Sequence, residues 1–138
     1  MKLFFDTNIL IDLLTERSPF YDDAKTIVGM CDRGEAHGVF ASFSVCNIIY
    51  ILRKGFNPKE LRECISELSN IIEMLDTRAA EVKAALGGDD SDFEDAVQRI
   101  CAEENGADVI ITRDKDGFAN ATIPVMTPTE FLDKIERE

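Results

Sequence analysis

Three short stretches of the sequence hold acidic residues where carboxylates could take part in a reaction. Asp6 ends an apolar run and is followed by Thr7 and Asn8. Five acids fall within residues 89–95, and a third polar stretch spans residues 112–117. Each stretch also has a purely structural explanation. The first could cap a helix, the second could offset a helix dipole, and the third could form a polar turn.

Binding a divalent metal ion would give the three stretches a common role. Mg²⁺ and Mn²⁺ take oxygen ligands, usually a few carboxylates completed by water. Such an ion polarises a phosphate, activates water and neutralises the charge that develops in phosphodiester hydrolysis. Without a cation, two carboxylates about 4 Å apart repel by roughly 4 kcal/mol at an effective dielectric constant near 20. A cluster retained despite this repulsion therefore indicates a cation site.

Other catalytic chemistries find little support in the sequence. There is one histidine, His37, and no two cysteines form a C-x-x-C pair, so a zinc site is not expected. The sequence contains neither a P-loop nor a G-x-G-x-x-G motif. We expect the four cysteines to be buried and reduced: Cys31, Cys46, Cys64 and Cys101.

Length and composition favour one domain over residues 1–138, since 45% of the residues are hydrophobic. No apolar run is long enough for a signal peptide or a membrane span, which predicts a cytoplasmic protein without a membrane partner. The 15 basic and 27 acidic residues give a net charge of −12, which repels nucleic acid at long range. A nucleic-acid function would therefore need local cations, a bound metal or a basic partner.

The apolar periodicity predicts alternating strands and helices. This alternation predicts an α/β fold with a central parallel sheet of four to five strands and helices on both faces. Sites in such sheets lie beyond the carboxyl ends of the strands, where Asp6 and Asp114 fall. Strands are expected at 2–5, 38–42, 71–75, 108–112 and 125–126. Helices are expected at 7–15, 19–34, 43–54, 77–86 and 92–105, and two more begin at residues 58 and 128. Ser91 is the expected cap of the helix at 92–105.

The ordered set of motifs resembles the PIN domain family. Its parts are Asp6-Thr7-Asn8, then Asp92-Phe93-Glu94-Asp95-Ala96, then Ile111-Thr112-Arg113-Asp114, and residues 123–132 are similar to the end of such domains. The resemblance covers essentially the whole chain and implies a single PIN-like domain. The family includes VapC-type toxins, which implies a ribonuclease dependent on Mg²⁺ or Mn²⁺, a homodimer and a small antitoxin partner.

Matching the family's motifs position by position implies the roles of individual residues. In the helix after the second strand the family usually has a glutamate, and here residues 42–50 offer Asn47, whose amide oxygen could bind a metal or position water but brings no charge. Asn8 matches a polar residue that supports the first acid. The catalytic candidates are therefore Asp6, Asn47, Asp95, Thr112 and Asp114, and the candidate metal ligands are Asp6, Asp92, Asp95, Asp114 and Asp116.

Phosphate groups of an RNA substrate would need cations near this site. We expect Arg113 to serve because two proposed site residues flank it, whereas Arg53, Lys54, Arg99 and Lys115 are interpreted as solvated charges. Exposed apolar residues such as Phe20 and Tyr21 could form a dimer face, although a place in the core is the favoured interpretation.

Two other functions compete with the ribonuclease. One is a catalytically weak or inactive module that binds RNA or protein, with Asn47 marking the lost chemistry. The other is phosphoryl transfer with Asp6 as the covalent nucleophile, which would require a lysine that the sequence does not assign.

Overall fold

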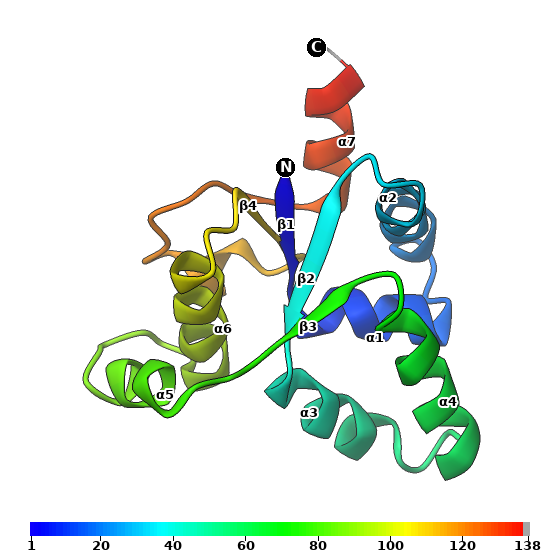
Figure 1. The fold of residues 1–138 in the computed structure, drawn as a ribbon, viewed down its shortest axis with the longest axis horizontal. Coiled ribbons are helices and arrows are strands. Elements are labelled where there is room, and N and C mark those ends of the chain that lie inside the picture. Colours follow the sequence, from blue (N-terminus) through cyan, green and yellow to red (C-terminus); the bar gives the residue numbers. More distant parts are fainter. Residues whose placement is uncertain (137–138) are drawn as a thin grey trace.

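A computed structural model describes residues 1–136, and Figure 1 shows its arrangement. None of the helices in this part of the chain is long and apolar enough to cross a membrane. The elements, in chain order, are β1 (Lys2–Phe5), α1 (Thr7–Thr15), α2 (Tyr21–Asp32), β2 (His37–Ala41), α3 (Phe43–Leu52), α4 (Pro58–Leu68), β3 (Glu73–Leu75), α5 (Ala79–Leu86), α6 (Phe93–Glu104), β4 (Val109–Ile111), the 3₁₀ helix η1 (Lys115–Phe118), β5 (Val125–Met126) and α7 (Pro128–Glu136).

The five strands form one parallel sheet in the order β3-β2-β1-β4-β5. β1 is central, and its Leu3 is in register with Gly38 of β2 and Val109 of β4. The chain builds outward from β1 to β3 and then returns to the other side of β1. The order therefore reverses between β1 and β4, and such a switch point opens a crevice at the carboxyl ends of the strands. The predicted α/β class and parallel sheet are confirmed.

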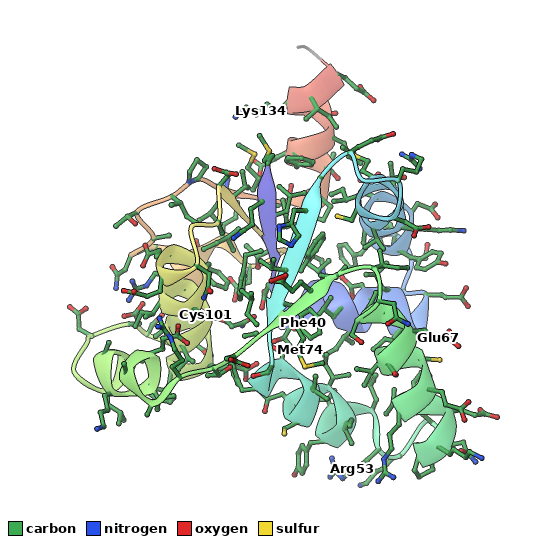
Figure 2. All side chains as sticks on the ribbon, viewed as in Figure 1. Phe40, Arg53, Glu67, Met74, Cys101 and Lys134 are labelled. Carbon is green, nitrogen blue, oxygen red and sulfur yellow. The ribbon has the colours of Figure 1, made fainter. Side chains whose placement is uncertain are left out.

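Helices cover both faces of the sheet because alternate strand residues point to opposite sides. Leu3 and Phe5 pack into one core with α1, α2 and α4, whereas Phe4 packs into a second core with α6. Figure 1 shows α1, α2 and α4 on one side of the sheet and α5 and α6 on the other. In Figure 2, Phe40 belongs to the first core and Cys101 to the second.

Several details differ from the expectations. Asp92 rather than Ser91 caps α6, because its carboxylate accepts the backbone N–H of Asp95 at 2.9 Å. α2 begins at Tyr21 and β3 covers only Glu73–Leu75, both shorter than predicted. The prediction that all four thiols are buried is wrong for two of them, since Cys46 and Cys64 are exposed.

Candidate active site

Asp6 lies at the end of β1 with only 2% of its surface exposed. One carboxylate oxygen accepts a hydrogen bond from Gln98 Nε2 at 2.9 Å, and the other accepts one from Thr112 Oγ1 at 2.7 Å. Burial raises the pKa of Asp6, and these bonds together with the backbone N–H groups of Thr7 and Asn8 oppose that rise. The carboxylate is therefore fixed in place by its neighbours.

Thr112 connects Asp6 to the loop that carries Asp114. Its hydroxyl donates to Asp6 and accepts the backbone N–H of Asp114 at 3.0 Å. Thr112 follows β4 and is fully buried, so its side chain is held at the same sheet edge as Asp6. The predicted proximity of the first and third acidic stretches follows from this hydroxyl.

Gln98 is a site residue that the motifs did not reveal. Its Nε2 donates to Asp6 and lies 3.5 Å from Asp95 Oδ1, while its Oε1 accepts the backbone N–H of Thr7 at 3.0 Å. The side chain is completely buried. A polar residue one turn after Asp95, between Val97 and Cys101 of the apolar stripe, was the available signal.

Asp95 is the residue on which the negative charges of the site converge. Its half-buried side chain stands on α6, and its pKa is raised to about 7, first by desolvation and then by repulsion from neighbouring carboxylates. Those neighbours are Asp6, Asp92, Asp114 and Glu94. The predicted catalytic acids thus interact electrostatically although they come from different parts of the chain.

Gly117 shows how closely the loop after β4 approaches Asp95. A Cβ at position 117 would overlap the Asp95 carboxylate and would lie 3.4 Å from Asp114 Oδ2. Asp95 and Asp114 are therefore neighbours across this glycine, and the absence of a side chain there makes room for them.

Asn47 meets a carboxylate that comes from α6. Burial raises the pKa of Glu94, with Asp92 and Asp6 adding repulsion, and the nearby Asn47 side chain opposes that rise. Both side chains line a hollow of about 340 Å³ between α3, α5 and α6. The negative charge that position 47 lacks is thus present on a neighbouring helix, and the motifs had not assigned Glu94 a role.

Some predicted residues contribute differently from the expectation. Asp116 is exposed in η1 and is not among the carboxylates that most raise the Asp95 pKa. Asn8 is exposed and supports Asp6 through its backbone N–H. Arg113 is turned toward α1, where its Nε and Nη2 bind the fully buried Asp12 at 2.6 and 3.2 Å. Asp12 lies on α1, farther along the chain than Asp6, and it directs the guanidinium away from the acids of the candidate site.

The donors at this edge suit a hard divalent cation because they are carboxylate, amide and hydroxyl oxygens. Within residues 1–136, no group of three or more Asp, Glu, Cys or His side chains is arranged so that it could hold a metal ion. Mg²⁺ usually binds through one or two carboxylates and keeps waters or substrate phosphates as its other ligands. The paired acids of this site fit that open kind of binding, and a single ion shared by Asp6, Asp95 and Asp114 stays a prediction.

Solved structures with the same fold include VapBC-1 from nontypeable Haemophilus influenzae, with a TM-score of 0.69 and 19% identity over 94% of this chain and 99% of that one. The Mycobacterium tuberculosis toxin VapC20, described as cleaving the sarcin-ricin loop, gives a TM-score of 0.68 and 15% identity over 86% and 94%. A curated relative, Ribonuclease VapC1 of Aquifex aeolicus (strain VF5), is 28% identical over 138 residues, covering 96% of this chain and 94% of the relative. The PIN domain model matches residues 2–116. The chain therefore belongs to the PIN domain family.

Proposed function

We propose that this protein is a VapC-like ribonuclease that depends on Mg²⁺ or Mn²⁺. The observation that carries the proposal is the convergence of three acids at one sheet edge: Thr112 links Asp6 to the backbone of Asp114, and Asp95 and Asp114 meet across Gly117. Carboxylates held together against their own repulsion form a site that a cation stabilises. The ribonuclease name of the Aquifex aeolicus relative, which aligns over nearly the whole of both chains, supports the reaction class.

A bound divalent ion would supply charge neutralisation and water activation for phosphodiester hydrolysis. Asp6 and Asp95 would hold the ion from β1 and α6, and Asp114 would complete the acidic side of the site from the loop after β4. Thr112 and Gln98 act through Asp6, because their hydrogen bonds fix both of its carboxylate oxygens. Asn47 orients Glu94 at the border of the site.

Asp6 is poorly placed for the competing role of covalent nucleophile. It is 98% buried by surface area and both of its oxygens already accept hydrogen bonds. To act as a nucleophile, Asp6 would need an exposed carboxylate oxygen that could attack the phosphorus of a bound phosphoryl group. The buried and bonded state of Asp6 suits an anchor for a cation better.

We further propose a small antitoxin as the protein partner and a homodimer as the active form. Solved structures of similar fold include VapBC-1 of Haemophilus influenzae and a toxin–antitoxin complex from Klebsiella pneumoniae. With a net charge of −12, a basic partner segment would also be electrostatically favoured.

The test is cleavage of RNA by purified protein in Mn²⁺, compared among wild type, Asp95→Asn and Asp133→Asn. Asp133 is an exposed acid of α7 and serves as the matched control. We expect Asp95→Asn to lose about a hundredfold or more in kcat/KM, and Asp133→Asn to keep wild-type activity. Equal cleavage by all three proteins would show that the activity comes from a contaminant.

Calorimetry with Mn²⁺ separates the enzyme from the non-cleaving module. If the protein is a metal-dependent enzyme, we expect Mn²⁺ to give binding heat with wild type and none with Asp95→Asn. A protein that binds RNA but gives neither Mn²⁺ heat nor cleavage would be the inactive module, in which Asn47 marks the lost chemistry.

A further inference from the structure

Aromatic rings and cations alternate on one surface beside the proposed active site. Arg17 and Arg113 stack on the Phe20 ring, with their guanidinium carbons 5.6 and 4.2 Å from its centre, and Lys25 lies 5.6 Å from the centre of the Tyr21 ring. We call these five residues the α2 patch. Three of the four cation–π contacts in the described part of the chain fall here. Cations interleaved with aromatic rings are typical of surfaces that bind single-stranded nucleic acid.

A hollow of about 460 Å³ opens within the α2 patch. Phe20 and Asp23 line it from α2 and the segment before it, Arg113 from the end of β4, and residues 127–129 from the start of α7. Its volume falls within the range of pockets that hold small ligands. Phe20 and Arg113 line it as a stacked pair, so a planar base that enters meets an aromatic side chain and a guanidinium together.

The charges around the hollow favour an uncharged base over a phosphate as its occupant. Asp23 is in its wall, and its carboxylate accepts the Thr129 hydroxyl at 2.6 Å. That charge repels a phosphate but accepts N–H groups from an uncharged ring. Outside the hollow, Arg17 and Lys25 form no salt bridge with any residue of 1–136, which makes them available to phosphates.

The hollow and the acidic site are joined through the backbone. Arg113 lies between Thr112, which binds Asp6, and Asp114. A base in the hollow would therefore contact the residue next to Asp114 in the chain, although the Arg113 guanidinium itself is turned toward Asp12.

We propose that this hollow is a nucleobase subsite for single-stranded RNA. One base of the substrate enters it and packs against the Phe20–Arg113 pair, while Arg17 and Lys25 meet the neighbouring phosphates. The inference rests on the proposed function, since it places the scissile phosphate at the acidic edge. It also gives a net acidic protein a local means of holding RNA.

The test measures the affinity of a short fluorescent single-stranded RNA by anisotropy, with EDTA present so that binding occurs without cleavage. Phe20→Leu keeps apolar packing and removes the ring. Tyr50→Leu is the matched control, because Tyr50 is exposed and stacks with Arg53 on α3, away from the hollow. We expect about a tenfold loss of affinity for Phe20→Leu and no change for Tyr50→Leu. Equal affinity of all three proteins would overturn the subsite and leave the hollow to a peptide of a protein partner.

A second comparison does not depend on the folding of Phe20→Leu. Wild type and Arg17→Gln, which changes an exposed side chain, are tested with oligonucleotides that carry an abasic residue at successive positions. One abasic position should weaken binding by wild type about tenfold, and Arg17→Gln should bind all probes more weakly with a smaller dependence on salt. If no abasic position matters, the subsite is refuted.

Failure of the subsite and failure of the proposed function give different results. Cleavage that depends on Asp95, with affinity indifferent to Phe20, would refute the subsite alone. Affinity that depends on Phe20, without metal-dependent cleavage, would refute the ribonuclease and leave an RNA-binding module with this base subsite.

Discussion

Two groups of carboxylates gather around helix α6 and differ in what surrounds them. Near its middle, Arg99 lies 3.1 Å from Asp90 and 2.8 Å from Glu103, and its hydrogen bonds, together with its charge, hold the pKa of Asp90 below the ordinary value. Near its start, Asp95 faces other carboxylates and its pKa rises to about 7. The described residues give Asp95 no salt bridge. Acids neutralised by arginine stabilise the fold, whereas acids left to repel one another are available to a cation.

The largest expected effect is stabilisation of the Asp95 group by Mn²⁺. At a concentration of 100 times Kd, an ion that binds only the folded protein adds about 2.7 kcal/mol to the free energy of unfolding. We expect this gain in wild type and in Asp90→Asn, and its absence in Asp95→Asn. Thermal unfolding with and without Mn²⁺ measures it. The contrast between the two groups fails if Asp90→Asn also loses the response.

Removing the arginine should turn the Asp90 group into an uncompensated one. In Arg99→Met, the Asp90 side chain, which is 6% exposed, would keep its charge without a partner. We expect a loss of about 2 kcal/mol in urea unfolding at pH 7. The double variant Asp90→Asn with Arg99→Met should recover much of it, because no unpaired charge remains at position 90. A single variant as stable as wild type would contradict the interpretation.

The Asp95 group should destabilise the metal-free protein at high pH. The pKa of Asp95 lies higher in the folded protein than in the unfolded chain, so the folded state binds more protons between the ordinary value of 3.8 and about 7, and stability falls as pH rises through this window. With a discount for solvent screening, Asp95→Asn should be about 1 kcal/mol more stable than wild type at pH 8. At pH 3.5 the difference should largely disappear, because Asp95 is then mostly protonated in both states. Urea unfolding in EDTA at both pH values gives the comparison, and an equal difference at both would exclude repulsion as its cause.

The smallest effect concerns the space beside Asp95. A methyl group at Gly117 would push the Asp95 carboxylate aside, whereas at Gly55 nothing lies within 4 Å of the added Cβ. We expect Gly117→Ala to weaken Mn²⁺ binding about fivefold, roughly 1 kcal/mol, with Gly55→Ala unchanged. Calorimetry measures both affinities, and equal values would mean that Asp95 moves without consequence.

The arrangement of the sheet could be predicted because alternation of strands and helices leaves few topologies. The same pattern placed Asp6 at a strand end, and the pairing of β1 with β4 brought Thr112 to it. The exact ends of the helices and strands were harder to predict from the sequence. Ser91 and Asp92 are both good caps by residue type, and only the extended backbone of Asp92 and its bond to Asp95 decide between them.

Side-chain directions were the part that the sequence could not supply. Arg113 was expected among the acids because of its neighbours in the chain, but the buried Asp12 attracts its guanidinium to α1. Gln98 was not recognised as a site residue because its position in α6 falls among those of the apolar stripe. The meeting of Asn47 with Glu94 depends on the packing of α3 near α6 and leaves no spacing signal.

The bonds of Asp6 also determine when the site can exist during synthesis. Gln98 follows Asp6 by 92 positions in the chain, and Thr112 follows it by 106. A ribosome that has made Asp6 must therefore add a further 106 residues before the amide and the hydroxyl that anchor this carboxylate are both available. The growing polypeptide carries an unassembled site over that stretch of translation, so an RNA-cutting activity built on it would arise only after Thr112 has been made.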